Sequence, residues 1–176
     1  DTYSAFYEIV EHLIKEHDVK NLVFFSGREN TFENTERYKA FRKAMQDNSI
    51  PLSQENIWSI KNGHYNNAYD FAMEKFSTLE QIPDAIVCAN DFIALGVLKA
   101  AEEKKIQVPQ TLKITGCDDI HYSSSVIPSL TTVDGSLKKL GFEAVKYVLN
   151  DNRQEVEQIK AEPIFRDSCG CVTGIN

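Results

Sequence analysis

Apolar residues recur along the chain with two alternating periods, and this alternation predicts a regular order of helices and strands. Segments with apolar residues three and four apart are predicted to be the helices Thr2–His17, Glu33–Asp47, Asn66–Phe76, Phe92–Lys105 and Leu137–Leu149. Short apolar runs are predicted to be the strands Asn21–Gly27, Asn56–Ile60, Ala85–Ala89, Leu112–Gly116 and Leu130–Val133, followed by an extended run over Ala161–Phe165.

Strands that alternate with helices imply parallel pairing through right-handed crossovers, with helices on both faces of the sheet. The pattern therefore predicts a doubly wound α/β fold. A chain of 176 residues suffices for one domain, or for one domain and a piece of another. The closing stretch "RDSCGCVTGIN" loses the periodicity and is predicted to be a tail.

Composition narrows the class of protein without defining it. The hydrophobic share of 42% and the charged share of 26% are ordinary for a globular protein. The net charge of -7, without a block of basic residues, argues against a nucleic-acid-binding face. No apolar run approaches the roughly 20 residues that span a bilayer, so no membrane contact is predicted. Cys88 and Cys117 lie in apolar strands, where reduced thiols are common, which favours the cytoplasm.

Polar residues follow the predicted strands at the positions where ligands bind to open parallel sheets. The residues at these strand ends are Ser26 to Arg28, Lys61 to Tyr65, Asn90 with Asp91, Cys117 to Asp119, and Asp134. They are amides, acids and aromatics, and the chain has neither a Gly-x-x-x-x-Gly-Lys nor a Gly-x-Gly-x-x-Gly motif. The sequence therefore predicts a binding cleft and no nucleotide cofactor.

Each of these residues also has a purely structural interpretation. Asp91 directly precedes an apolar-periodic helix and is predicted to be its N-cap, which leaves Asn90 without a capping role and available to a ligand. The Asp118-Asp119 pair either faces a ligand or only forms a turn. Arg37 either faces the cleft, or is solvated or paired with Glu33 one turn earlier.

Catalysis and metal binding find less support in the sequence. Neighbouring residues in extended structure point to opposite sides, so Asp118 and Asp119 are not expected to share a proton. No Gly-x-Ser-x-Gly elbow is present, and no catalytic residue is predicted. His12 and His17 lie five residues apart and are not expected on one helix face. A single Cys-x-Cys pair is a weak metal motif, so Cys169 and Cys171 are predicted to be unpaired and reduced, and no metal site is predicted.

Three motifs together resemble one known family. They are "AND" followed by "ALG" in the next helix, the "GCDD" turn, and "PSLTTVDGS". The stretch from residue 1 to about residue 166 resembles the effector-binding core of the LacI/GalR family, which has the type I periplasmic-binding-protein-like fold. The resemblance implies two α/β lobes that close on a sugar, a nucleobase or a similar small effector, and it implies a homodimer.

The resemblance also implies the ligand-binding residues. Asp118 resembles the acid that binds ligand hydroxyls, Asn90 the amide at the strand end, and Arg37 the arginine of the "R-x-x-x-F" helix. Tyr65 resembles an aromatic wall, and Asp1 an acid before the first helix that faces the cleft. No cofactor and no metal are implied.

Family members begin with a DNA-binding headpiece and about three βα units that have no counterpart before Asp1. We therefore expect a fragment, with one complete lobe and parts of the other. Residues 1–20 are expected to be a helix of the missing N-terminal lobe, 21–133 the C-terminal ligand-binding lobe, 134–160 a crossover helix of the N-terminal lobe, and 161–176 a returning strand and tail.

Two kinds of parent protein fit this fragment. The segments "DTYSAFYEIVEHLIKEH" and "FRDSCGC" resemble a branch fused to histidine kinase or GGDEF modules, so the primary expectation is the sensor of a signal-transduction protein. The alternative is a LacI/GalR-type transcriptional regulator that contacts DNA through a headpiece absent from this sequence. An enzyme is a third hypothesis, which the lack of a nucleophile, a paired acid or a cofactor loop disfavours.

Overall fold

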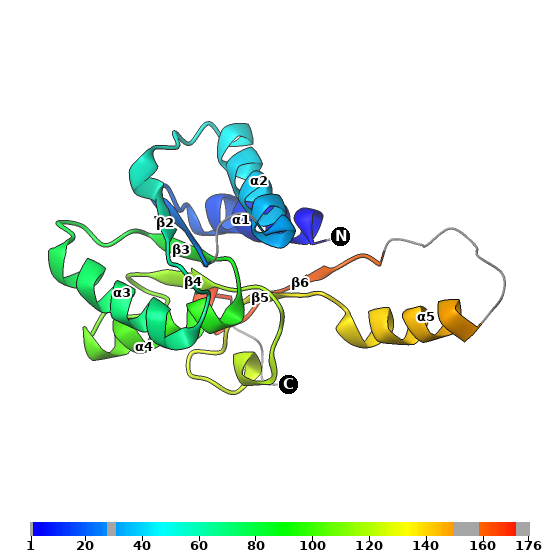
Figure 1. The fold of residues 1–176 in the computed structure, drawn as a ribbon. Helices are drawn as coiled ribbons and strands as arrows, with labels where there is room; N and C mark the ends of the chain where they lie inside the picture. The colour runs from blue at the N-terminus through cyan, green and yellow to red at the C-terminus, as the bar shows by residue number, and fades with distance from the viewer. Residues whose placement is uncertain (1, 28–30, 150–158, 172–176) are drawn as a thin grey trace.

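A parallel sheet with helices on both faces forms the centre of the molecule (Figure 1). The computed structural model describes residues 2–27, 31–149 and 159–171. The sheet has the strand order β2-β1-β3-β4 and consists of β1 (Leu22–Ser26), β2 (Ile57–Ser59), β3 (Ala85–Cys88) and β4 (Lys113–Thr115). The predicted doubly wound α/β fold is therefore confirmed.

The last two strands depart from the parallel pattern. β5 (Thr132–Asp134) and β6 (Glu162–Ile164) form an antiparallel pair, and only a parallel bridge between Thr115 and Thr131 connects this pair to the main sheet. A short 3-10 turn, η2 (His121–Ser124), lies between β4 and β5 in place of a helix. β5 therefore lacks the crossover helix that builds a further parallel strand.

Four helices cover the sheet in two pairs (Figure 1). α1 packs against α2 on one face, and α3 packs against α4 on the other. Their bounds are α1 (Tyr3–His17), α2 (Phe32–Asp47), α3 (Tyr65–Thr78) and α4 (Asp91–Glu103). The remaining elements are η1 (Gln54–Asn56), α5 (Leu137–Leu149) and η3 (Asp167–Cys169). Among the described residues, no helix has both the length and the apolar character needed to cross a bilayer.

The central strand β1 supplies large side chains to both layers of the core. Successive strand residues point to opposite faces. Phe24 contacts Phe6 of α1 and Phe41 of α2, with ring centroids 6.1 Å and 5.5 Å away. Phe25 contacts Trp58 and Phe71 at 5.8 Å and 5.0 Å. Each buried aromatic ring contributes about 2 kcal/mol or more, so β1 holds the two helix pairs to one sheet.

The position of α1 differs from the expectation that residues 1–20 complete a missing lobe. The apolar side of α1 is buried in the same core as the sheet, through Ala5, Phe6, Ile9, Val10 and Leu13. A helix that covers this sheet belongs to this lobe, because its removal would expose Phe24 and the neighbouring core. The other expected boundaries remain predictions.

The C-terminal segment also packs more closely than a tail. Ser168 and Cys169 of η3 are fully buried. Ser168 Oγ donates to Ile114 O over 2.6 Å and accepts from Thr131 N over 2.9 Å. The prediction of a tail is therefore wrong for residues 166–171. This segment is held by hydrogen bonds to backbone atoms, which leave no apolar periodicity in the sequence. Residues 172–176 lie outside the described part of the chain.

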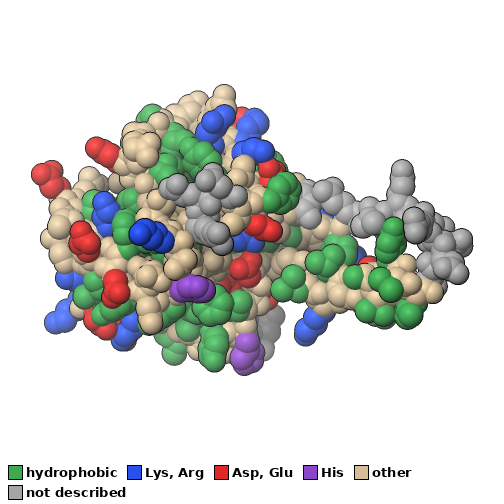
Figure 2. Space-filling view, in the orientation of Figure 1, with side chains coloured by type: hydrophobic (Ala, Val, Ile, Leu, Met, Phe, Trp, Pro, Cys, Tyr) green, Lys and Arg blue, Asp and Glu red, His purple; other side chains and the backbone are tan. Residues whose placement is uncertain are grey.

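α5 stands apart from the rest of the molecule (Figure 1). None of its residues is buried, although its sequence is strongly amphipathic, and Figure 2 shows green hydrophobic side chains along it. The exposed apolar side chains are Leu137, Leu140, Phe142, Val145, Tyr147, Val148 and Leu149. An exposed apolar surface of this length is typical of a helix that packs against another structure.

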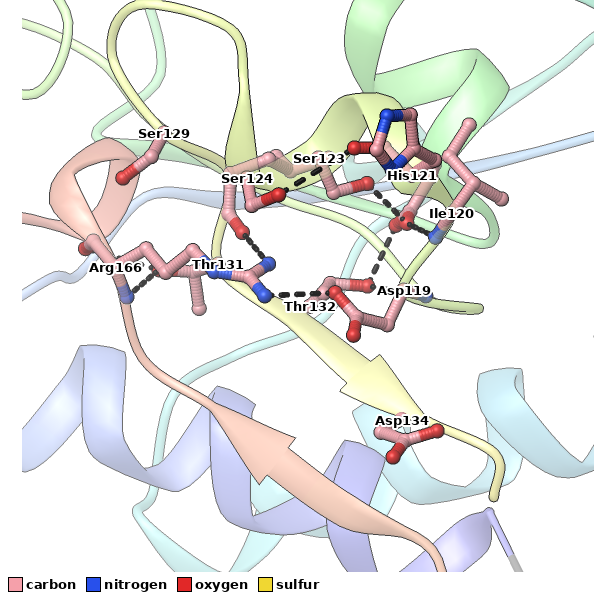
Figure 3. A network of polar contacts seen from close by, with 12 residues as sticks. Asp119, Ile120, His121, Ser123, Ser124, Ser129, Thr131, Thr132, Asp134 and Arg166 are labelled. Atoms are coloured by element: carbon pink, nitrogen blue, oxygen red, sulfur yellow. Dashed lines mark hydrogen bonds and ion pairs between the residues drawn. The ribbon is translucent and has the colours of Figure 1, made fainter. Parts of the chain in front are cut away.

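Asp91 is a buried carboxylate at the start of α4, and it is not the N-cap of that helix. Its side chain is 0% exposed. Oδ2 accepts from Ser123 Oγ over 2.6 Å and from Ile120 N over 3.0 Å. Oδ1 accepts from Thr132 Oγ1 over 2.6 Å. Figure 3 labels the three donor residues, Ile120 directly before η2, Ser123 in η2 and Thr132 in β5. Asp91 therefore connects α4 to the chain segment between β4 and β5.

We predict that Asp91→Ala lowers the free energy of unfolding by about 3 kcal/mol, because Ser123, Thr132 and Ile120 N lose a charged acceptor inside the protein. Urea denaturation measures the loss. The control is Asp70→Ala, which removes an exposed carboxylate from α3 and should change stability by less than about 0.5 kcal/mol. A loss of only about 1 kcal/mol would match a lost helix cap and would contradict the network role.

Candidate functional site

Arg37 of α2 reaches across the carboxyl ends of the strands to Asp118. Its Nη2 lies 2.9 Å from Asp118 Oδ1, and its Nη1 donates to the backbone oxygen of Ala89 at the end of β3. Arg37 is only 8% exposed. A solvated arginine and a pair with Glu33 were the structural alternatives, and both are wrong, because the guanidinium turns inward to the residues after β3 and β4. Two of the predicted site residues, far apart in sequence, therefore meet.

The carboxylate of Asp118 is partly open to solvent. Its side chain is 39% exposed, in contrast to that of Arg37. Desolvation raises the pKa of Asp118 from its ordinary value, while the charge of Arg37 acts in the opposite direction. A carboxylate that is paired on one side and open on the other can accept hydrogen bonds from a ligand.

The two adjacent acids lie in a turn that separates their side chains. Asp118 and Asp119 have positive φ angles of 124° and 44°, and only the second lies near the left-handed region that Asp tolerates better than most residues. Asp119 Oδ1 lies 2.8 Å from Arg166 Nη2 (Figure 3), whereas Asp118 contacts Arg37. The two carboxylates therefore serve different arginines and form no acid pair for catalysis.

Asn90 has the capping role that the sequence analysis gave to Asp91. Its Oδ1 accepts from Ile93 N over 2.8 Å at the first turn of α4. Its Nδ2 donates to Gly63 O over 3.2 Å in the loop after β2. The prediction that Asn90 has no capping role is wrong, since a cap requires a side-chain acceptor with an extended backbone, and Asn90 rather than Asp91 has both.

The loops after β1 and β2 approach closely beside Asn90. A Cβ atom on Gly27 would lie 2.5 Å from the Cα of Gly63, so neither loop has space for a larger residue at this contact. This approach places Gly63 against Asn90 and draws three strand ends together. Arg28, which follows Gly27, lies outside the described residues.

Tyr65 starts α3 and lines an apolar groove of about 430 Å³ between α3, α4 and the η2 loop. The other lining residues are Phe92, Leu95, Leu98, Lys99, Glu102, Tyr122, Val126 and Ile127. None of Arg37, Asn90 and Asp118 lines this groove. The fifth predicted site residue, Asp1, lies outside the described part of the chain.

The histidines and cysteines that showed no metal motif in the sequence meet in the structure. His12 Nε2 lies 3.1 Å from His17 Nε2 and 3.0 Å from Cys171 Sγ. The expectation that the two histidines face apart is wrong. Five residues of helix rise only about 7.5 Å, which two imidazoles at the end of a helix can span. Cys169 is buried beside this group.

Comparisons with known proteins identify the fold family. The family described as "Periplasmic binding protein-like domain" matches residues 10–169. The HTH-type transcriptional repressor PurR of Actinobacillus pleuropneumoniae serotype 3 (strain JL03) is 33% identical over 164 residues, 93% of this chain and 47% of that protein. A putative transcriptional regulator LacI from Bacillus cereus subsp. cytotoxis NVH 391-98 superposes with a TM-score of 0.85 at 28% identity, over 96% of this chain and 61% of that one.

The chain belongs to the LacI/GalR family of effector-binding domains with the periplasmic-binding-protein-like fold. The Escherichia coli transcriptional repressor ascG, at 22% identity and a TM-score of 0.84, has the same fold over 96% of this chain and 62% of its own. The chain spans about half the length of the curated relatives that it matches.

The relatives in this LacI/GalR group are transcriptional repressors and regulators, not enzymes. They agree with the alternative expectation of a transcriptional regulator. The primary expectation, a sensor fused to a histidine kinase or GGDEF module, finds no support among them.

The capping role of Asn90 predicts different effects for two substitutions. Asn90→Ala should lower the free energy of unfolding by about 1 kcal/mol, because Ile93 N loses its acceptor. Asn90→Ser keeps a side-chain acceptor for that amide and loses only the hydrogen bond to Gly63 O, so it should retain most of the stability. Thermal and urea denaturation measure both variants. Equal losses in the two variants would contradict the cap and assign the effect to the Gly63 contact.

Proposed function

We propose that this chain is the effector-binding domain of a LacI/GalR-type transcriptional regulator that binds a small sugar-like or nucleobase-like molecule. The observation that carries the proposal is the pairing of Arg37 with the half-open Asp118 at the carboxyl ends of the strands. Ligands bind to open α/β sheets at this edge. A repressor acts on DNA, so the proposal places the protein in the cytoplasm.

Arg37, Asn90 and Asp118 still carry hydrogen-bonding groups that a ligand can use. Arg37 Nε is buried without a hydrogen-bond partner within the described part of the chain, although buried donors are nearly always paired. The open side of Asp118 can accept from hydroxyl or ring N–H groups. Asn90 uses one of its two amide hydrogens for Gly63 and keeps the other. The site therefore suits a neutral ligand rich in donors and acceptors.

Asp1 and Tyr65 complete the proposed site in the parent protein. Tyr65 is half exposed at the start of α3, directly after the loop that contacts Asn90, and an aromatic ring there can cover the apolar face of a ring-shaped ligand. Asp1 supplies a second acid by family resemblance. No cofactor, metal or catalytic residue is part of this effector site.

The opposite wall of the cleft is assigned to an N-terminal lobe of the parent. We assign residues 134–160, of which 150–158 lie outside the described residues, to a crossover segment of that lobe. The reason is that α5 exposes seven apolar side chains and buries none of its own residues. A helix of this composition is stable when it packs against another apolar surface. DNA would be contacted only by a headpiece outside this sequence.

The apolar groove between α3 and α4 suits a homodimer of the parent. Phe92, Tyr122 and Ile127 are 46%, 62% and 99% exposed around it, on a chain that otherwise buries most of its large apolar residues. A groove with apolar residues at its rim can receive the same residues from a second copy related by a two-fold axis. Family membership supports dimerisation, and this face is the proposed location.

The effector site is tested with Asp118→Asn in the parent protein. Calorimetry against a panel of monosaccharides, nucleobases and nucleosides first identifies the effector. The variant should then bind it about 30- to 150-fold more weakly, equivalent to 2 to 3 kcal/mol, because a charged acceptor is lost. Asp70→Asn, on the exposed side of α3, should bind normally. Normal binding by a folded Asp118→Asn protein would show that the effector lies elsewhere.

The proposed dimer face is tested separately. Phe92→Glu places a charge in the groove and should convert a dimer to a monomer in sedimentation velocity at micromolar concentration. The matched control is Phe32→Glu, at the start of α2, where Phe32 is 77% exposed and lies outside the groove. If both variants remain dimeric, the dimer uses another surface.

A further inference from the structure

Two histidines of α1 and two cysteines of the C-terminal segment point to one place in the structure. One ligand atom from each of His12, His17, Cys169 and Cys171 lies within 4.8 Å of all the others. It is the one such group among the residues that the structure describes. We propose that these four side chains bind a Zn²⁺-type divalent ion that clamps the C-terminal segment to α1.

The distances between the ligand atoms are close to those of a tetrahedral site. Bond lengths of about 2.05 Å for Zn–N and 2.3 Å for Zn–S place two nitrogens about 3.3 Å apart, and a nitrogen and a sulfur about 3.6 Å apart. His12 Nε2 and His17 Nε2 are 3.1 Å apart. Cys171 Sγ lies 3.0 Å from the first nitrogen and 3.6 Å from the second. Shifts of about 0.6 Å or less would bring these three atoms to tetrahedral spacing. Cys169 Sγ lies within 4.8 Å of all three and donates to Arg166 O over 3.2 Å, and it would turn from that oxygen to complete the coordination.

Hydrogen bonding alone does not satisfy this cluster well. The Nε2 atom of a neutral imidazole either donates or accepts, and it cannot do both. The mutual contacts among His12, His17 and Cys171 would therefore require one N–H to serve two partners. A cation at the centre would accept a lone pair from each ligand atom, so that no N–H would have to serve two partners.

The backbone turn between the two cysteines places both thiols near the end of α1. Gly170, between Cys169 and Cys171, has a φ of +101°, in the region where only glycine is unstrained. A Cβ atom at Gly170 would lie 3.2 Å from Cε1 of His17, so the missing side chain also makes room for that ring. His17 is the last residue of α1, where the helix no longer crowds its ring. The glycine turn brings both cysteines toward the helix end.

The surrounding contacts hold these ligands in place without a metal. Ser168, next to Cys169, is hydrogen-bonded to Ile114 O of β4 and to Thr131 N. The ring of His12 lies against Phe165, with centroids 4.1 Å apart. Ligands that are held in position before binding reduce the ordering cost of metal capture.

The chemistry of the donors selects the class of metal. Two thiols and two imidazoles suit Zn²⁺ in a closed tetrahedral site, and they do not suit Mg²⁺ or Ca²⁺, which prefer oxygen ligands. The two thiols must lose their protons, so binding one Zn²⁺ releases two H⁺ and changes no oxidation state.

The proposal is tested by metal binding to the chain and to its ligand variants. Protein kept reduced and dialysed against metal-free buffer should take up one Zn²⁺ per chain, measured by mass spectrometry of the metal. Competition with a chromophoric chelator should show more than about 100-fold weaker binding for Cys171→Ser and for His12→Gln. Co²⁺ should give sulfur-to-cobalt charge-transfer absorption in the near ultraviolet, which both variants lose or weaken.

His121→Gln is the matched control, because His121 is exposed in η2 and outside the cluster, and it should bind Zn²⁺ like the unmodified chain. Circular dichroism establishes that the variants are folded. Zn²⁺ should raise the melting temperature of the unmodified chain and of His121→Gln, and leave that of Cys171→Ser and His12→Gln unchanged. Failure of the unmodified chain to retain Zn²⁺ would overturn the proposal. Equal retention by a folded Cys171→Ser protein would overturn it as well. None of these outcomes depends on effector binding.

Discussion

The buried carboxylate of Asp91 is the constraint on which the arrangement of the strand ends depends. Its backbone N donates to Cys117 O over 2.9 Å, and its side chain accepts from Ile120 N over 3.0 Å. Asp91 therefore holds the chain on both sides of the Asp118-Asp119 turn. A turn with two successive positive φ angles is costly unless its surroundings determine it, and the network around Asp91 does so.

The two acids of this turn pair with different arginines. Asp118 faces Arg37 and the open edge of the sheet, where the effector is proposed to bind. Asp119 faces Arg166 and so ties the turn to the segment that follows β6 (Figure 3). The same segment continues to Cys169 and Cys171. The proposed effector site and the proposed metal site are thus linked through a few polar contacts around β4 and β5.

The exposed face of α5 is an apolar surface that no other described part of the chain covers. A helix with apolar residues on one side gains little stability in water unless that side is covered. The sheet of this chain is already covered by α1 and α2 on one face and by α3 and α4 on the other. Both faces of the sheet are thus occupied by other helices, and α5 covers neither of them.

The sequence by itself determined the α/β class, the order of the elements and the edge of the sheet where the polar residues gather, because apolar periods and strand ends are local properties. It did not determine which of Asn90 and Asp91 caps α4, since that depends on backbone angles and on donors from Ser123 and Thr132. Only the tertiary structure decided that Arg37 meets Asp118, that α1 completes this core and that His12 lies beside Cys171. The physical reason is that Arg37 and Asp118 are 81 positions apart and His12 and Cys171 are 159 apart, and that packing of the whole core sets the geometry of all three contacts.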